Sequence, residues 1–277
     1  MLVVSLSSVP PRFPLLSHSL KSLAAQGGPV SRIVLYIPKC YRRFPDWDGR
    51  LPDVPEGVEI RRTEADYGPA TKILCAARDF AGQDVDILFC DDDHVYAPGW
   101  AQSFVDLKAR HRGCVIAQGG WQVFEYTDSS NERDLEPRAV RTWRITDVGF
   151  QLRYLWQDIR HWRRRHSLTA PPRRTFKRSG YVDVFEGYAG VLVRPEFFDQ
   201  GFYEIPPALW TVDDVWLSGM LTLKGIPIWV EGNIMDPRQS AAQCHAPLAR
   251  EVVDGVDRRA ANRRGVLYFR DQHGIWP

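Results

Sequence analysis

The sequence predicts an α/β fold with a mostly parallel central sheet flanked by helices. In the first half of the chain, short apolar runs alternate with segments of helical periodicity, as in strand–helix–strand units. Gly and Pro residues separate these segments and mark their ends. The chain has 277 residues, of which 44% are hydrophobic, and this is enough to bury a sizeable core.

The elements of the first half follow from periodicity and turn residues. The expected strands are residues 2–6, 33–37, 58–60, 85–90 and 114–117. The expected helices are residues 14–26, 68–80 and 98–113. Pro69 fits the first turn of the second helix, and Gly82 fits its end.

The second half is less regular, and residues 119–180 hold few clear periodic elements. Order returns with apolar runs at 182–185 and 190–193, a helix at 213–224 and a strand at 226–230. We therefore expect an irregular region beside the sheet.

Composition excludes several classes of protein. The 36 basic and 34 acidic residues give a charge of +2, so no global field points to nucleic acid. The five cysteines are scattered, which fits a reducing compartment. No apolar stretch approaches the ~20 residues of a membrane span. The apolar N-terminus lacks a basic leader and meets Pro10-Pro11 at once, so we expect a cytoplasmic protein without a signal peptide.

An acidic triplet, Asp91–Asp93, follows the apolar strand expected at 85–90. Ligands of such sheets bind beyond the carboxyl ends of the strands. If the strand continues, Asp91 and Asp93 point to one side and Asp92 to the other. Two converging carboxylates would suit Mg²⁺ or Mn²⁺, and a solvated acidic turn is the alternative.

Lys72 lies in the first turn of its expected helix, after Gly68. A helix N-terminus with a lysine suits an anion, and glycine lets a phosphate approach the backbone. A surface lysine is the alternative. The dinucleotide-binding and P-loop glycine motifs do not occur in the sequence.

Asp213 and Asp214 open the helix expected at 213–224, where acids are normal partners of the helix dipole. A carboxylate that faces a cleft there could instead accept a proton from an attacking hydroxyl. The turn 186–190, Glu-Gly-Tyr-Ala-Gly, would let a ligand approach the backbone, or is a plain structural turn.

Four segments in this order resemble GT-A type nucleotide-sugar glycosyltransferases, both the bacterial family-2-like enzymes and the β1,3-transferases with a Glu-Asp-Val pattern. The segments are Asp66–Lys72, Asp91–Asp93, Gly187–Gly190 and Asp213–Gly219. The resemblance spans about residues 2–230. It implies a Rossmann-like GT-A domain over 1–277, with a nucleotide-sugar-binding half (1–118) and an acceptor-side half (119–277) that contains a basic insertion (156–180).

The resemblance also implies roles for individual residues. Asp91 and Asp93 match the D-x-D pair, with Asp93 as the direct ligand of Mn²⁺ or Mg²⁺ and Asp91 nearer the ribose. Asp214 matches the acid of the x-E-D motif, which is the general base of inverting members. Asp213 replaces the Glu of that motif. The expected acceptor-binding residues are Asp213, Gly187 and Tyr188. The expected nucleotide-sugar-binding residues are Ser7, Pro11, Arg12, Asp66, Gly68, Lys72, Asp91 and Asp92.

A C-terminal histidine often completes the metal shell in this family. His245 is the candidate third ligand beside Asp91 and Asp93, and His273 is the alternative. A structural role is the common one for a single histidine.

The resemblance therefore implies a metal-dependent, inverting glycosyltransferase. It would move a sugar from a nucleotide-diphosphate donor, expected to be a UDP-sugar, to a hydroxyl of a glycan or glycolipid in cell-envelope polysaccharide biosynthesis. The physics agrees, because the departing diphosphate needs cations and the attacking hydroxyl needs a base. A metal-dependent nucleotidyltransferase and a nuclease or nucleic-acid-binding protein are the alternatives. Both would use the same carboxylates.

Residues 160–178 hold eight cations and no acid. Together with Trp156 and Trp162, the arginines at 163–165 could contact the inner face of an anionic membrane, as part of a surface spanning 156–178. The stretch could also bind an anionic acceptor, or form a solvated loop.

Overall fold

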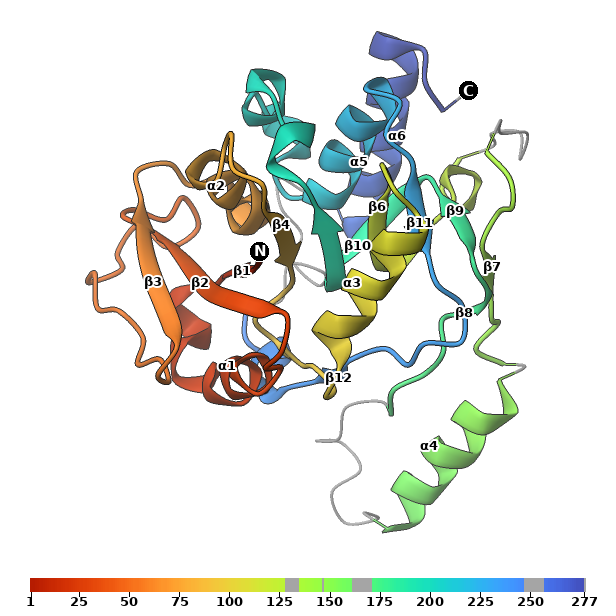
Figure 1. Ribbon diagram of the computed structural model, residues 1–277, viewed down its shortest axis with the longest axis horizontal. Helices are drawn as coiled ribbons and strands as arrows, with labels where there is room; N and C mark the ends of the chain where they lie inside the picture. The colour runs from red at the N-terminus through yellow and green to blue at the C-terminus, as the bar shows by residue number, and fades with distance from the viewer. Residues whose placement is uncertain (128–134, 146, 161–170, 247–256, 277) are drawn as a thin grey trace.

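The computed structural model describes residues 1–127, 135–145, 147–160, 171–246 and 257–276. Its centre is an eight-stranded sheet of order β3-β2-β1-β4-β10-β6-β11-β9, with helices on both faces (Figure 1). The strands of this sheet are β1 (Leu2–Ser7), β2 (Val30–Pro38), β3 (Val58–Thr63), β4 (Asp86–Phe89), β6 (Val115–Trp121), β9 (Gly180–Val182), β10 (Val184–Val193) and β11 (Ile228–Val230).

The α-helices and short elements complete the described chain. The α-helices are α1 (Ser17–Ala24), α2 (Thr71–Asp79), α3 (Trp100–Arg110), α4 (Val148–Arg160), α5 (Asp213–Leu223) and α6 (Arg258–His273). The two-stranded pairs are β5 (His94–Val95) with β12 (Arg238–Gln239), and β7 (Val140–Arg141) with β8 (Phe176–Arg178). The 3-10 helices are η1 (Pro10–Leu15), η2 (Gly68–Ala70), η3 (Val123–Glu125), η5 (Pro195–Phe197), η6 (Gln200–Tyr203), η7 (Pro207–Leu209) and η8 (Ala241–Cys244).

Strand directions confirm the predicted mostly parallel sheet. Strands β3, β2, β1 and β4 are parallel neighbours. β10 is antiparallel to both β4 and β6, so β6 points the same way as β4, and β11 is parallel to β6. Among the described strands of this sheet, only β10 and the edge strand β9 run in the opposite direction. The α/β class and the helix-covered sheet agree with the fold that the GT-A resemblance implies.

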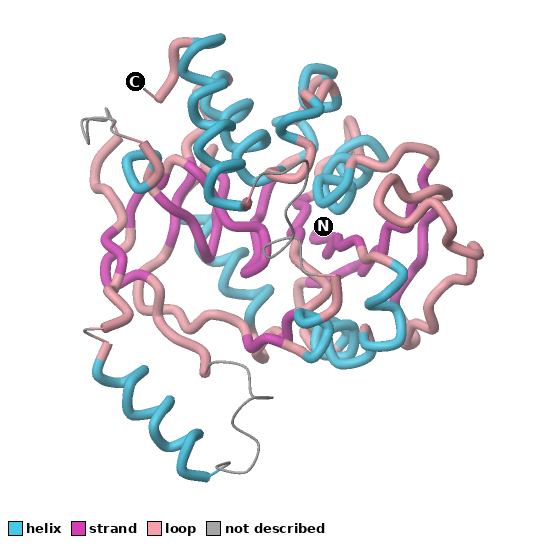
Figure 2. The backbone as a smooth tube through the Cα atoms, turned by 180° about the vertical axis from the view of Figure 1, so that it is seen from behind, coloured by secondary structure: helices cyan, strands magenta, loops and turns pink. Residues whose placement is uncertain are grey.

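The sheet buries a hydrophobic cluster on each face. Alternate residues of β1 point to opposite faces, so Val3 belongs to the cluster that includes residues of α2, α5 and α6, while Val4 belongs to the cluster with residues of α1 and α3. Phe269 of α6 belongs to the first cluster and Phe104 of α3 to the second. The view from behind shows the same three layers (Figure 2).

The first half of the chain follows the predicted order of elements with two corrections. The helix expected at 14–26 is divided at Leu16 into η1 and α1, because Pro10, Pro11 and Pro14 hold the first part in a 3-10 turn. The strand expected at 85–90 ends at Phe89, so the acidic triplet lies in a turn and not on a strand. Strand alternation therefore does not apply to it.

The second half holds two α-helices that the periodicity analysis missed, α4 and α6. The apolar runs at 182–185 and 190–193 belong largely to one long strand, β10. Residues 161–170 of the predicted basic insertion, with Trp162 and the arginines at 163–165, lie outside the described residues. A membrane-spanning helix does not occur among the described elements, since none combines the required length and apolarity.

A bulge interrupts β10 beside the carboxyl end of β4. Glu186 pairs with Gly119 of β6 and Val191 pairs with Ala117, so the four residues 187–190 lie opposite the single residue 118. The second part of β10, residues 191–193, pairs with β4. The first part therefore extends beyond the end of β4, where the acidic triplet begins.

Gly190 closes this bulge, and its replacement by Ala should destabilise the fold. Its φ is +112°, and a Cβ there would lie 2.6 Å from the Trp100 ring. We expect Gly190→Ala to lower the free energy of unfolding by about 2–4 kcal/mol, measured by urea denaturation. The control is Gly113→Ala, which has φ +80° and no atom within 4 Å of the added Cβ. Equal losses in the two variants would contradict the proposed clash.

Candidate active site

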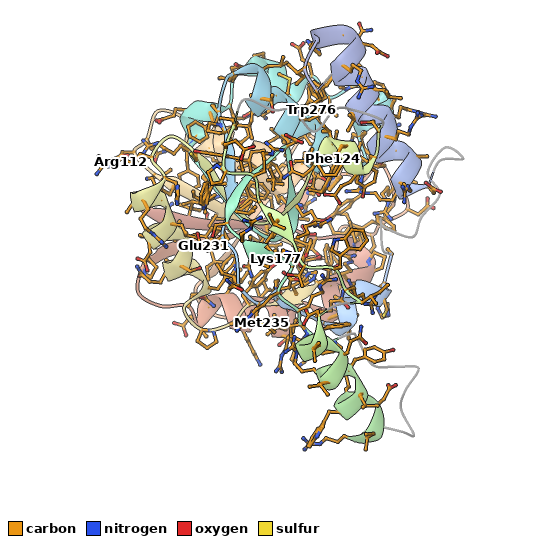
Figure 3. The ribbon with its side chains drawn as sticks, turned by 90° about the vertical axis from the view of Figure 1, so that its right-hand side faces the viewer. Arg112, Phe124, Lys177, Glu231, Met235 and Trp276 are labelled. Carbon is orange, nitrogen blue, oxygen red and sulfur yellow. The ribbon has the colours of Figure 1, made fainter. Side chains whose placement is uncertain are left out.

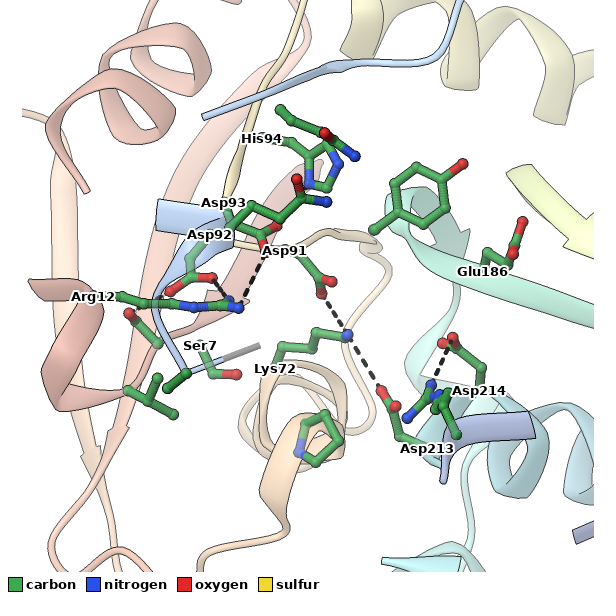
Figure 4. A pocket seen from close by; sticks show the side chains of 18 of the residues that line it. Ser7, Arg12, Lys72, Asp91, Asp92, Asp93, His94, Glu186, Asp213 and Asp214 are labelled. Carbon is green, nitrogen blue, oxygen red and sulfur yellow. Dashed lines mark hydrogen bonds and ion pairs between the residues drawn. The ribbon is translucent and has the colours of Figure 1, made fainter. Parts of the chain in front are cut away.

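A cavity of about 530 Å³ lies beyond the carboxyl ends of β1 and β4 (Figure 4). The turn after β1, the start of α2, the acidic triplet, the first part of β10 and the starts of α5 and α6 supply its walls. Its ionisable lining includes Arg12, Lys72, Asp91, Asp92, Asp93, Glu186, Asp213, Asp214, Asp236 and Arg258. The predicted carboxylates and cations are therefore gathered in one cavity.

Lys72 is a buried cation between the two acidic motifs. Its Nζ lies 2.6 Å from Oδ1 of Asp91 and 3.2 Å from Oδ2 of Asp213 (Figure 4). Burial disfavours the charge, but the carboxylates of Asp213 and Asp91 outweigh it and raise the Lys72 pKa. The same ion pair holds the Asp91 pKa below its ordinary value, against the effect of burial. Lys72 therefore stays charged at neutral pH.

Arg12 is the second cation of the cavity and is partly buried. Its Nη1 lies 2.6 Å from Oδ1 of Asp92, and its Nη2 lies 3.2 Å from Oδ2 of Asp93. Burial opposes the charge of Arg12, but these two carboxylates raise its pKa overall. The Asp92 carboxylate also accepts a hydrogen bond from the Ser8 hydroxyl. Burial raises the Asp92 pKa to about 6 although Arg12 opposes the change.

The side chains of the acidic triplet do not pair as the sequence analysis expected. Asp92 and Asp93 share Arg12, while Asp91 faces Lys72, whereas alternation had placed Asp91 and Asp93 together. The cause is the end of β4 at Phe89, after which the turn sets the side-chain directions. The Tyr96 hydroxyl fixes this turn, at 2.8 Å from the Asp91 carbonyl and 3.0 Å from the Tyr188 carbonyl.

The donor set fits a divalent cation only in part. Within the described ranges, no group of three or more His, Cys, Asp or Glu side chains is arranged to hold a metal ion. Asp91 and Asp93 nevertheless both line the cavity. Mg²⁺ is commonly bound by one or two carboxylates together with substrate phosphates. The residues present therefore fit a cation that takes further oxygens from a bound diphosphate.

Neither candidate histidine lies in the cavity wall. The His245 side chain is exposed, and the backbone carbonyl of His245 accepts a hydrogen bond of 2.9 Å from Nε of Arg12. The His273 ring packs at the end of α6, 5.7 Å from the ring of Tyr268 and 5.6 Å from that of Phe269. A different histidine, His94, directly follows the triplet, and its Nδ1 lies 2.6 Å from Oδ1 of Asp93.

Asp214 lies at the start of α5 and is partly buried. Its Oδ1 accepts a hydrogen bond of 3.1 Å from the backbone N–H of Gly187, and Arg258 lies 3.7 Å from its Oδ2. Burial, followed by repulsion from Asp213, raises the Asp214 pKa to about 8. A Cβ on Gly187 would lie 3.0 Å from Nζ of Lys72 and 3.1 Å from Oδ1 of Asp214. Glycine at 187 thus allows β10 to approach both groups closely.

Glu186 is a cavity carboxylate that the sequence analysis did not single out. Its Oε2 lies 3.2 Å from Nη2 of Arg141. Burial raises the Glu186 pKa to about 7, although Arg141 lowers it, and Asp236 adds to the rise. Asp236 itself is partly buried, accepts a 2.6 Å hydrogen bond from Thr175, and has its pKa raised by burial to about 6. The available signal for Glu186 was its position as the first residue of the predicted turn 186–190.

α6 contributes two further residues that the sequence did not indicate, Arg258 and Asn262. Asn262 is buried, and its Oδ1 has no hydrogen-bond partner in the described part of the chain. A buried amide oxygen at a cavity wall can accept a hydrogen bond from a ligand hydroxyl. The buried side of α6 consists largely of small residues, so the sequence shows little apolar periodicity there. The contribution of α6 to the cavity wall is therefore seen only in the folded chain.

The remaining predicted residues occupy different positions around the cavity. Ser7, Asp66, Gly68 and Tyr188 line it. Both Asp66 carboxylate oxygens accept backbone N–H groups at 2.8 Å, from Arg42 and from Gly68, so Asp66 closes a turn. Pro11 is exposed on η1 and does not line the cavity, and Gly187 contributes its backbone amide to Asp214.

No family model and no curated protein matches this chain. Among solved structures, S. aureus TarS 1-349 aligns with a TM-score of 0.44 and 13% identity, over 85% of this chain and 59% of that chain. TarS 1-349 in complex with UDP-GlcNAc gives a TM-score of 0.44 and 13% identity, over 85% of this chain and 57% of that chain. A structure of S. aureus TarS gives 0.45 and 12%, over 99% of this chain and 44% of that chain. The chain thus spans less than two thirds of these structures, and a similarity this distant does not define a substrate.

The raised pKa of Asp214 gives a test by pH. Between pH 3.8 and about 8, folded Asp214 keeps a proton that the unfolded chain has lost, so its contribution to stability falls as the pH rises through this window. We expect the urea midpoint of Asp214→Asn to fall less steeply over this range than that of the unmodified protein. The exposed variant Asp53→Asn is the control and should follow the unmodified profile. Parallel profiles for all three proteins would show that Asp214 is ordinarily ionised.

Proposed function

We propose that this protein is an inverting glycosyltransferase. It transfers a sugar from a nucleotide-diphosphate donor, a UDP-sugar, to a hydroxyl of a glycan or glycolipid acceptor of the cell envelope. The observation that carries the proposal is the buried Lys72 between Asp91 and Asp213, with Asp214 beside it in the same cavity. This arrangement combines a site for a leaving diphosphate with a carboxylate for the attacking hydroxyl.

The donor side is built from the cations and the acidic triplet. Arg12 and Lys72 place two permanent positive charges at the end of the sheet, where a diphosphate would need them. Asp91 and Asp93 would hold Mn²⁺ or Mg²⁺. When bound, the cation supplies further neutralisation of the negative charge that develops on the leaving group. Ser7 lies in the same wall and would contact the nucleotide.

Asp214 is the proposed general base. A general base works best when its pKa is near the working pH, and burial raises the pKa of Asp214 to about 8. Its neighbour Asp213 is paired with Lys72, so Asp213 is held in place as a counter-charge. Among the described residues, Asp214 has Arg258 as an ion partner, at 3.7 Å, and Asp214 can accept a proton from an acceptor hydroxyl.

The acceptor side is the wall formed by β10 and α6. Glu186 and Asn262 present hydrogen-bonding groups there, together with Tyr188. The aromatic rings of Trp121 and Tyr126 line the same cavity, and flat apolar faces suit sugar rings. We assign to these residues the positioning of the acceptor hydroxyl near Asp214.

A thermal-shift series with UDP-, GDP-, CMP- and TDP-sugars, with and without Mn²⁺, tests the donor site. A nucleotide present at about 100 times its Kd should raise the melting temperature by roughly 5 °C. We expect the UDP-sugar to give this shift with Mn²⁺, and Asp93→Asn to lose the part that depends on Mn²⁺. Asp53→Asn, with an exposed carboxylate, is the matched control.

A retained Mn²⁺-dependent shift in Asp93→Asn would contradict the metal assignment. The absence of a shift with every nucleotide sugar would contradict the donor class. Product analysis then separates reaction types, because a glycosyltransferase releases a nucleoside diphosphate and a nucleotidyltransferase releases pyrophosphate.

Separate variants of Asp214 and Glu186 test the catalytic assignment. Asp214→Asn should lower kcat by about 10²-fold or more, because the base is lost, while the donor Kd stays nearly unchanged. Glu186→Gln should mainly raise the acceptor KM, because it loses a positioning contact. Steady-state kinetics and calorimetry provide these values. A larger loss of kcat in Glu186→Gln than in Asp214→Asn would contradict the assignment and would indicate Glu186 as the general base.

A further inference from the structure

α4 presents an uncovered apolar face to solvent. In three views α4 projects away from the body of the molecule, with side chains extending into solvent in the third (Figures 1, 2 and 3). Phe150 is the one residue of α4 that is buried. The apolar face of α4 consists of Val148, Leu152, Leu155, Trp156 and Ile159, which are 56% to 68% exposed.

The spacing of these residues shows that the exposure is organised. Counted from Val148, the others follow after four, seven, eight and eleven positions, which places all of them along one side of the helix. Helices of soluble domains normally turn such a side toward the core, but here the anchoring residue is Phe150, which lies on the other side. Ile145, before the helix, is also highly exposed. A continuous apolar face of this kind indicates a binding surface.

The charges around this face favour an anionic partner. α4 carries Arg153 and Arg160 against one acid, and the guanidinium of Arg160 lies 5.7 Å from the Trp156 ring at the edge of the face. In the sequence, residues 160–178 contain eight cations and no acid. Two copies of the chain that met through α4 would bring these like charges together. Anionic lipid headgroups would instead neutralise them.

The position of α4 relative to the cavity is a second argument. Phe150 in the first turn of α4 lines the cavity, and its ring is covered by Arg144 at 5.1 Å and Arg173 at 6.0 Å. The helix therefore starts at the cavity wall and extends outward from it. A surface in contact with the rest of α4 would lie close to the cavity entrance.

We propose that the apolar face of α4 lies in the headgroup region of an anionic lipid bilayer, with Arg153 and Arg160 contacting lipid phosphates. A helix with one apolar side, tryptophan and flanking arginines is suited to lie in the plane of this interface. The proposed docking rests on the apolar face of α4 and the charges around it, and does not depend on the proposed function. Its consequence for the substrate, a lipid-linked acceptor that reaches the cavity from the membrane, rests on the function proposed above.

Vesicle flotation of the full chain, without donor or metal, tests the docking. We expect binding to mixed phosphatidylcholine–phosphatidylglycerol vesicles, and roughly tenfold weaker binding to phosphatidylcholine alone or in high salt. The variant Leu152→Gln/Trp156→Gln/Ile159→Gln should lose at least about tenfold of the affinity for mixed vesicles. The control Leu51→Gln/Leu135→Gln/Leu223→Gln changes three exposed leucines outside α4 and should bind normally.

Three results would overturn the proposal. The first is an unmodified protein that does not float with mixed vesicles. The second is equal loss of binding in the triple variant and its control. The third is self-association in sedimentation velocity that the triple variant abolishes, since the face would then bind a second copy.

The single variant Trp156→Gln, which alters one exposed ring, keeps the test decisive if the triple variant unfolds. It should weaken binding to mixed vesicles, and unchanged affinity would count against the proposal. Because no nucleotide sugar is used, failure of this test leaves the donor-binding results untouched, and failure of the donor test leaves vesicle binding untouched.

Discussion

The ammonium group of Lys72 is held inside the protein between Asp91 and Asp213, and the shape of the cavity depends on this contact. It connects the turn after β4 to the start of α5, two segments far apart in the sequence. Removing one partner of a buried ion pair costs about 3–5 kcal/mol, because the other charge remains without compensation. The Ser5 hydroxyl, which donates to the Lys72 carbonyl, also connects β1 to this helix start. The carboxylates and the lysine thus fix one another in the cavity before any ligand arrives.

Charge compensation within the cavity is uneven, and this unevenness is chemically useful. Arg12 and Lys72 each face two carboxylates, so Asp91, Asp92, Asp93 and Asp213 all have a cation as ion partner. Burial outweighs the nearby cations at Asp214 and Glu186, whose pKa values rise to about 8 and about 7. Both groups therefore titrate near neutral pH, where proton transfer is most effective. The two sides of one cavity have different electrostatic properties because their ion pairs differ.

Local patterns in the sequence predicted the strands of the first half, and the GT-A resemblance implied that Lys72, Asp91 and Asp214 lie in one site. Apolar runs and turn residues determine those strands, and the carboxyl ends of parallel strands must meet at one edge. The division of the acidic triplet could not be predicted, because it depends on β4 ending at Phe89 and on Arg12 reaching in from η1. α6 and its Asn262 were missed because small residues on the inner face leave little apolar periodicity. The spacing that forms the apolar face of α4 was present in the sequence, but the exposure of this face is a property of the tertiary structure.

The bulge in β10 divides this strand into a part that pairs with β4 and a part that lines the cavity. Residues 191–193 pair with β4 and belong to the framework of the sheet. Glu186 and Tyr188 project from the same strand into the cavity, beyond the end of that pairing. Side chains there can be exchanged without disturbing the backbone ladder that holds the sheet together. If the proposed acceptor site is correct, substitutions at these two positions would alter acceptor choice while the sheet stays intact, and directed libraries could begin there.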